Sequence, residues 1–318
     1  MDARDPARLT RRDVLTGAVA VGAGFAVARR GEAAPAPMPT RAFGATGRTV
    51  SAFGLGCFYL GASASDAEAV TVLRRALELG CTYVDTAPSY GRGQSERRVG
   101  LALEGRRDGV FLATKTLERD PKAARRELEE SLRRLRTDHV DLIQVHCVRD
   151  AADLDVVLSD AGPLPALLRA RDEGLVRHVG VTGHEDPEVM KKCVEGFAWA
   201  SVLLPLNPVD LAWKSFVEGT LPAAAAKGIA RVGMKVFASG RLLVGDGAPS
   251  AADCLRFAYG LDVSTTIVGC ASVAEVELAA KVATEAKPLD AAERAALVAA
   301  CKPYSGKTGR GVEWYKRA

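Results

Sequence analysis

The sequence predicts an α/β fold in which eight parallel strands close into a barrel surrounded by helices. Short apolar runs alternate strictly with amphipathic stretches from about residue 40, and eight such pairs follow one another. This pattern is typical of a (β/α)8 TIM barrel. No Gly/Ser-rich linker follows residue 37, so we expect one domain at 38–318 behind a leader at 1–37. A doubly wound open sheet is the alternative, although it would more often divide into two halves.

A hairpin is expected first, because residues 41–43 and 49–51 flank the turn sequence GATG. The apolar runs that predict the barrel strands are 52–56, 82–85, 110–114, 140–145, 177–182, 201–206, 230–236 and 265–269. The helical patterns are 66–79, a stretch from Ser95, 121–135, 165–172, 187–194, 214–227, 249–259 and 273–283. Asp290 and Glu293 have the spacing of a capping box, which predicts one extra C-terminal helix.

The composition is ordinary for a folded soluble protein, with 48% apolar and 26% charged residues. The net charge of +4 is weak, and no basic block is long enough to predict nucleic-acid binding. The seven cysteines are odd in number and lack CxxC spacing, which argues against a disulfide framework and against a zinc knuckle. No metal site is predicted.

The leader resembles a twin-arginine export signal. The pair Arg11-Arg12 precedes a small, apolar segment at 17–28 and an Ala/Pro-rich stretch at 33–37. The apolar segment is too short and too rich in Gly and Ala for a stable membrane span. We therefore expect the export machinery as a partner and a periplasmic mature protein. A disordered uncleaved tail, a membrane tether and a cytoplasmic location are the alternatives.

Ionisable side chains are predicted at the ends of three successive strands. The second strand is followed by Asp85 and Tyr90, the third by Lys115 and the fourth by His146. In a parallel barrel these ends meet at one open mouth. A lysine beside a phenol would lower its pKa, a carboxylate would orient that lysine, and an imidazole could hydrogen-bond a substrate carbonyl. Each residue alone would more often be structural, but the four together predict a catalytic set.

Three segments resemble the signature segments of the aldo-keto reductases. They are DTAPSYG at 85–91, TKT at 114–116 and DLIQVH at 141–146. The resemblance runs from about residue 38 to 283, with the segments in the family's order. It implies an NADP(H)- or NAD(H)-dependent oxidoreductase that reduces an aldehyde or ketone to an alcohol, or catalyses the reverse reaction.

The resemblance also implies a role for each of the four residues. Tyr90 would be the proton donor and Lys115 would tune its pKa. Asp85 would be the partner of the lysine, and His146 would orient the carbonyl. The small-molecule carbonyl substrate is the expected partner.

The resemblance places the nicotinamide cofactor against the ends of the later strands. The residues at the expected positions are Thr182, His184, Asn207, Met234, Lys235, Gly269, Ser272 and Glu275. Leu203 and Met234 stand where the family usually has a glutamine and an aromatic ring. Glu275 stands where an arginine usually meets the adenosine 2′-phosphate. Because a carboxylate repels a phosphate, this position opposes the family's NADP(H) preference, and NAD(H) is kept as the alternative cofactor.

Two other functions are alternatives. The departures from the family pattern at Leu203, Met234 and Glu275 favour a non-catalytic nicotinamide-binding redox sensor or accessory subunit on the same barrel. His146 and His184 on neighbouring loops suggest a metal-dependent hydrolase, but two histidines without a carboxylate cluster are too few ligands.

Overall fold

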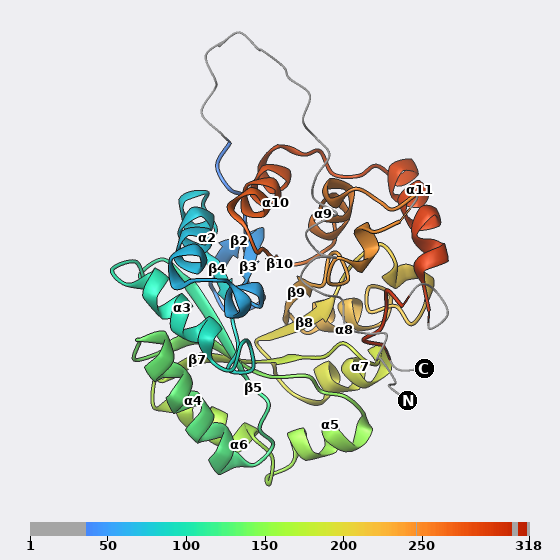
Figure 1. The fold of residues 1–318 in the computed structure, drawn as a ribbon. Coiled ribbons are helices and arrows are strands. Elements are labelled where there is room, and N and C mark those ends of the chain that lie inside the picture. The colour runs from blue at the N-terminus through green and yellow to red at the C-terminus, as the bar shows by residue number, and fades with distance from the viewer. Residues whose placement is uncertain (1–35, 246, 307–310, 317–318) are drawn as a thin grey trace, which may run out of the picture.

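The computed structural model describes residues 36–245, 247–306 and 311–316. Within them, eight strands form a closed barrel in the order β10-β3-β4-β5-β6-β7-β8-β9, and every neighbouring pair is parallel. Helices surround the strands (Figure 1). This confirms the predicted (β/α)8 barrel and excludes the open sheet. The predicted leader lies outside the described residues except for Ala36 and Pro37, so the division at residue 37 stays a prediction.

Each barrel strand coincides with one predicted apolar run. The strands are β3 (Phe53–Gly56), β4 (Tyr83–Asp85), β5 (Phe111–Thr116), β6 (Val140–Val145), β7 (Val176–Thr182), β8 (Ser201–Pro205), β9 (Ala230–Met234) and β10 (Thr265–Gly269). All residues of β5 and β6 are buried, as expected for strands covered on both faces. Two predicted ends were wrong by two residues, and the others agree within one. β5 continues to Thr116, so Lys115 lies inside it, and β9 stops at Met234, so Lys235 lies in the following loop.

The helices also follow the predicted order. They are η2 (Tyr59–Ala62), α2 (Asp66–Glu78), α3 (Gln94–Leu103), α4 (Pro121–Leu135), α5 (Ala151–Leu158), α6 (Leu164–Asp172), α7 (Pro187–Gly196), η3 (Asp210–Ala212), α8 (Thr220–Ala226), η4 (Arg241–Leu243), α9 (Ala251–Tyr259), α10 (Val273–Glu285), α11 (Ala291–Cys301) and η5 (Lys302–Tyr304). α11 is the predicted C-terminal helix, and Asp290 and Glu293 form its capping box. No helix among the described residues is both long and apolar enough to cross a membrane.

Two helices differ from the prediction. α5 was missed because it is short, and its N-cap, Asp150, accepts a hydrogen bond from the backbone of Asp153. α8 begins at Thr220 instead of residue 214. The carboxylate of Asp210 accepts hydrogen bonds from the backbone N–H groups of Phe216 and Val217, and this local bonding competes with a helix.

The predicted hairpin is formed by the antiparallel strands β1 (Thr40–Ala42) and β2 (Thr49–Ser51). The fully buried ring of Phe43 follows β1 and packs on Tyr83 and Phe111, at centroid distances of 5.7 and 4.6 Å. Because Tyr83 and Phe111 are the first residues of β4 and β5, the aromatic cluster fills the N-terminal end of the barrel. The opposite end remains for the loops that build a site.

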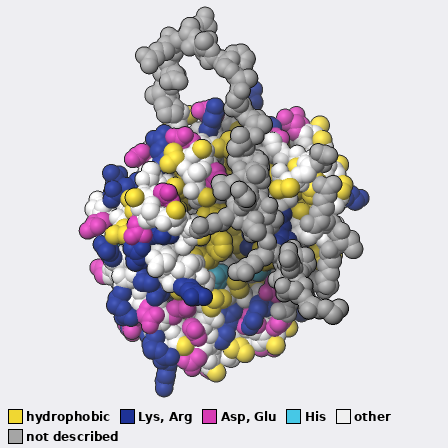
Figure 2. Space-filling view, viewed as in Figure 1, with side chains coloured by type: hydrophobic (Ala, Val, Ile, Leu, Met, Phe, Trp, Pro, Cys, Tyr) yellow, Lys and Arg dark blue, Asp and Glu magenta, His cyan; other side chains and the backbone are white. Residues whose placement is uncertain are grey.

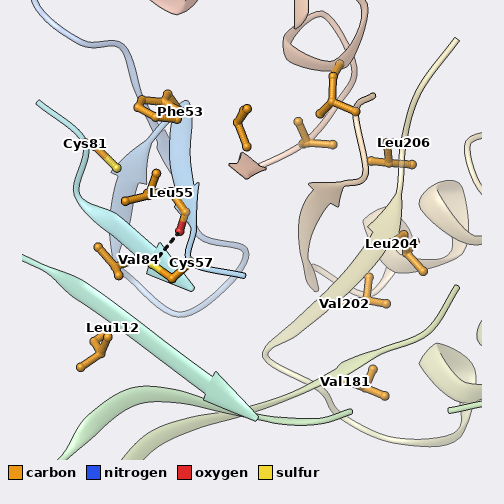
Figure 3. Close-up of a cluster of buried hydrophobic side chains, with 14 of the residues drawn as sticks. Phe53, Leu55, Cys57, Cys81, Val84, Leu112, Val181, Val202, Leu204 and Leu206 are labelled. Carbon is orange, nitrogen blue, oxygen red and sulfur yellow. Dashed lines mark hydrogen bonds between the residues drawn. The ribbon is translucent and has the colours of Figure 1, made fainter. Parts of the chain in front are cut away.

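The core has two layers. Val202 and Leu204 belong to a large cluster that also includes residues of the surrounding helices, whereas Leu203 belongs to a smaller cluster with Phe43 and Tyr83. Figure 3 shows Val202 and Leu204 on the same side of β8. This alternation along a strand places Leu203 inside the barrel.

Candidate active site

A cleft of about 1040 Å³, measured with its open mouth, lies at the C-terminal ends of the strands. Asp85, Tyr90, Lys115 and His146 all line it, so the fold brings the four predicted catalytic residues together. Histidine side chains lie among hydrophobic ones near the centre of the face shown in Figure 2. The wall of the cleft is therefore largely apolar, with a few converging polar groups, as is usual for small-molecule sites.

Lys115 and Asp85 form a buried ion pair at the bottom of the cleft, with exposed side-chain fractions of 1% and 0%. The Lys115 ammonium also donates a hydrogen bond to the carbonyl of Thr86 at 2.8 Å. Gln144 donates to the second carboxylate oxygen of Asp85 at 2.9 Å. Each buried charge thus has several partners, which offsets the cost of removing it from water.

The ring of Tyr90 lies beside this pair, with the Lys115 ammonium 4.8 Å from its centroid. Burial raises the pKa of Tyr90 above its ordinary value, although the charge of Lys115 and a hydrogen bond with it act to lower that pKa. Lys115 therefore lowers the pKa of Tyr90, as predicted. The expectation of a lowered pKa is nevertheless not met, because the desolvation of the phenolate outweighs the attraction of the lysine.

His146 packs against Tyr90, with the two rings edge-to-face at a centroid distance of 6.1 Å. Burial, followed by the charges of Lys115, His184 and Lys235, holds the pKa of His146 well below its usual value. Its imidazole is therefore neutral at physiological pH. Its buried Nδ1 has no hydrogen-bond partner among the described residues, so it can bond to a ligand.

The loop that carries His146 is fixed by a partly buried arginine. The guanidinium of Arg119 donates to the backbone carbonyls of His146 and Cys147 at 3.0 and 3.2 Å. Both oxygens of Asp153 accept from the same guanidinium at 2.7 and 3.0 Å. Because Asp153 belongs to α5, the helix missed from the sequence helps to place the imidazole.

A sequence profile of the aldo/keto reductase family matches residues 52–250, which is more than half of the chain. The chain belongs to this family. It is an NAD(P)-dependent oxidoreductase, and its cofactor is a nicotinamide nucleotide.

Two curated proteins illustrate the relationship. L-Galactose dehydrogenase of Arabidopsis thaliana is 28% identical over 296 residues, which cover 78% of this chain and 89% of that protein. The uncharacterised oxidoreductase YqkF of Bacillus subtilis is 32% identical over 185 residues. That match spans 54% of this chain and only 58% of YqkF.

Solved structures of family members extend over most of the chain. The holo form of the aldo-keto reductase AKR11C1 from Bacillus halodurans is 26% identical, with a TM-score of 0.70, and covers 86% of this chain and 99% of that one. An aldo-keto reductase from Klebsiella pneumoniae in complex with NADPH is 25% identical, with a TM-score of 0.68. Its match covers 85% of this chain and 97% of that one.

Five of the eight residues predicted to bind the cofactor line the cleft, namely Thr182, His184, Met234, Lys235 and Gly269. Leu203 lines it as well. Burial lowers the pKa of His184 to about 4, so this imidazole is also neutral, and its buried Nδ1 has no partner among the described residues. Open space and the unpaired Nδ1 atoms of the two cleft histidines, His146 and His184, fit a nicotinamide ring with its polar carboxamide.

Asn207 has a supporting position instead of lining the cleft. Its buried amide donates to the carbonyl of Lys235 at 3.1 Å and to the hydroxyl of Tyr315 at 3.0 Å. It therefore joins the loop after β9 to the C-terminal segment.

Ser272 and Glu275 also lie outside the cleft lining, at the N-terminus of α10. The Ser272 hydroxyl accepts from the N–H of Glu275, and the Glu275 carboxylate accepts from the N–H of Ala271 at 2.6 Å. A helix N-terminus ordinarily attracts phosphate. Here the exposed carboxylate of Glu275 already accepts from the N–H of the residue before the N-cap, so an added phosphate would meet a negative charge.

Aromatic residues at the cleft mouth were not predicted from the sequence. They are Phe58, Tyr59, Phe237 and Trp314. Trp314 comes from the C-terminal segment 311–316, which is held by Lys316, a fully buried residue whose ammonium lies 2.9 Å from the Asp210 carboxylate. In the sequence, the aromatic pair Trp314-Tyr315 in a charged tail was the only indication that the C-terminal segment contributes to the cleft.

The described residues contain no group of three or more His, Cys, Asp or Glu side chains arranged to hold a metal ion. His146 and His184 both line the cleft, but no carboxylate cluster accompanies them there. The donor set of a metal-dependent hydrolase is thus not found in this part of the chain.

Proposed function

We propose that this oxidoreductase reduces an aldehyde or ketone to an alcohol, or catalyses the reverse reaction, with Tyr90 as the proton donor. The observation that carries this proposal is the convergence of Asp85, Tyr90, Lys115 and His146 in one largely apolar cleft. When bound, the nicotinamide cofactor supplies or accepts the hydride.

The proposed roles follow from the surroundings of each side chain. The Tyr90 hydroxyl donates its proton to the carbonyl oxygen. The ammonium of Lys115, held in place by Asp85, stabilises the phenolate that remains. The neutral imidazole of His146 hydrogen-bonds the carbonyl oxygen and orients the substrate. The apolar wall excludes water, which strengthens these interactions.

A non-catalytic nicotinamide-binding sensor or accessory subunit is the second candidate. The observation that favours it is the self-capped N-terminus of α10, where Glu275 occupies a position suited to a phosphate. A protein of this kind would bind nucleotide without reducing carbonyl compounds.

Titration of the purified protein with NADH and NADPH, followed by a panel of aldehydes, separates the two candidates. We expect tighter binding of NADH, and we expect Glu275→Gln to improve NADPH affinity about 5-fold, since one charge at contact distance in water is worth about 1 kcal/mol. Nucleotide fluorescence measures the affinities. Glu277→Gln is the matched control, because its carboxylate is on the same helix but pairs with Arg75.

Two results would contradict this proposal. Nucleotide binding without turnover of any aldehyde would favour the sensor. An unchanged ratio of NADPH to NADH affinity in the Glu275 variant would remove that carboxylate from cofactor selection.

We also propose that the protein is exported in its folded state and carries its cofactor with it. The support is the paired-arginine leader ahead of a barrel that needs a nicotinamide nucleotide. Nicotinamide nucleotides are cytoplasmic, so a freely exchanging one would be lost after export. Retention for hours requires a binding free energy of roughly −12 kcal/mol or better. A partner or second substrate would then recycle the nucleotide in place.

Fractionation of the native host tests this proposal. We expect the mature protein in the periplasm, and purification without added nucleotide is expected to release NAD(H) or NADP(H) on denaturation. The double variant Arg11→Lys/Arg12→Lys is expected to keep the protein inside the cell. Periplasmic protein without nucleotide would rule out the proposal that the protein carries its cofactor with it. Wild-type protein found only in the cytoplasm would rule out export.

A further inference from the structure

Lys235 is a cation in the active-site cleft that has no acidic partner in the part of the chain that the structure describes. The charged side chains that line the cleft are Asp85, Lys115 and Lys235, and the first two neutralise each other. Among the described residues, no carboxylate pairs with Lys235. Both cleft histidines are neutral, as described above. The cleft therefore has one uncompensated positive charge.

The contacts of Lys235 place its ammonium beside the C-terminal segment. The nitrogen lies 5.2 Å from the ring centroid of Trp314 and 5.7 Å from that of Tyr315, both in the C-terminal segment. Its charge also lowers the pKa values of His146 and His184, which follow β6 and β7. The ammonium therefore lies beside these aromatic rings, in the cleft that His146 also lines, while Glu275 and the N-terminus of α10 lie outside the cleft lining.

The backbone at Lys235 is held in an unfavourable conformation. Its φ of 55° lies in the left-handed region, as do those of Ala238 and Ser239 at 47° and 59°. Such conformations cost energy in residues other than glycine and persist where the surroundings enforce them. Here Asn207 bonds the Lys235 carbonyl and ties it to Tyr315. The fold thus fixes the lysine with its amine in the cleft.

An ammonium in this position has a clear chemical preference. Burial lowers the pKa of Lys235, since the charged form has lost part of its hydration. The π faces of Trp314 and Tyr315 compensate in part. A carboxylate within hydrogen-bond distance would compensate much more strongly.

We propose that Lys235 binds a carboxylate of the carbonyl substrate, so that this oxidoreductase acts on aldehydes or ketones that carry an acid group. The proposal rests on the proposed function. The half-exposed rings of Phe58 and Trp314, with exposed fractions of 57% and 50%, line the same cleft and suit an apolar body between the two polar groups.

The test compares 3- and 4-carboxybenzaldehyde with their methyl esters, which have a similar shape but no charge. We expect the wild-type kcat/KM for the better acid to exceed that for its ester by about 10- to 100-fold, as a charge-assisted hydrogen bond allows. Lys235→Met keeps the apolar stem and is expected to bring this ratio to about one. Lys235→Arg is expected to retain a ratio well above one.

Arg241→Met is the matched control. Arg241 lies 5.6 Å from the same Trp314 ring but does not line the cleft, so its loss is expected to leave the acid-to-ester ratio high. Binding of benzoate to the cofactor-loaded protein, followed by tryptophan fluorescence, gives a readout without turnover. Its affinity is expected to fall about 10-fold or more in Lys235→Met.

The outcomes separate the two possible sources of the anion. If Lys235→Met weakens NADH binding and lowers kcat/KM for acid and ester equally, the lysine binds a cofactor phosphate and the proposal is overturned. A wild-type ratio near one would also overturn it, while turnover of the esters would still support carbonyl reduction. Failure to reduce any of these aldehydes would overturn the proposed function and this inference together.

Discussion

Replacing Tyr90 with phenylalanine is expected to lower the rate of aldehyde reduction by about 10²- to 10⁴-fold, the usual contribution of a positioned general acid. The phenylalanine ring keeps the packing of Tyr90, including the edge-to-face contact with Phe58 at 5.2 Å. Only the proton donor is lost, so nucleotide affinity is expected to stay close to that of the wild type. Steady-state kinetics and an NADH titration measure the two quantities.

Tyr59→Phe is the control for this variant. Tyr59 also lines the cleft, and its substitution removes a phenol hydroxyl from the same environment. We expect a much smaller loss of rate, because its ring is not beside Lys115. Near wild-type turnover in the Tyr90 variant would exclude Tyr90 as the acid.

Replacing Lys115 with methionine is expected to affect both stability and catalysis. Asp85 would be left as a buried charge without its cation, which typically costs about 3–5 kcal/mol of unfolding free energy. Burial alone lowers the pKa of Lys115, but Asp85 and Tyr90 together raise it above its ordinary value. The stabilisation is therefore complete at pH values below about 10, the ordinary pKa of lysine, and is lost only as the pH rises further. Urea denaturation at pH 7 measures the loss.

The same variant is expected to move the pH profile of turnover upward. The charge of Lys115 lowers the pKa of Tyr90, so its removal allows that pKa to rise further. The limb of the profile that reports Tyr90 ionisation then moves to higher pH in either reaction direction. The double variant Asp85→Asn/Lys115→Met is expected to recover part of the stability but not the original pH profile. An unchanged profile in Lys115→Met would make the lysine purely structural.

The sequence analysis was most successful where the signal is local. The strands were found within a few residues of their ends because they are short apolar runs that helices cover on both faces. It was least successful at α5 and α8. In these two places a single carboxylate, of Asp150 or of Asp210, decides how the backbone is bonded.

In the candidate site too, residues placed by local patterns were predicted and residues placed by distant contacts were not. The positions of Asp85, Lys115 and His146 at one mouth follow from parallel strands that end together. The place of Asn207 could not be read in the same way, because its partners Lys235 and Tyr315 are 28 and 108 residues away along the chain. Pairing at that separation depends on packing that no local pattern records.

Hydrophobic periodicity and strand order are properties of the chain, so the barrel, the order of its elements and the four residues that meet in the cleft could be predicted from the sequence. The tertiary structure was needed to establish that Trp314 lines the cleft, that Lys235 shares this cleft with His146 and has no acidic partner among the described residues, and that burial outweighs Lys115 in setting the pKa of Tyr90. The physical reason is that burial and electrostatic fields are sums over all neighbouring elements, and distant segments such as the one anchored by Lys316 contribute to them.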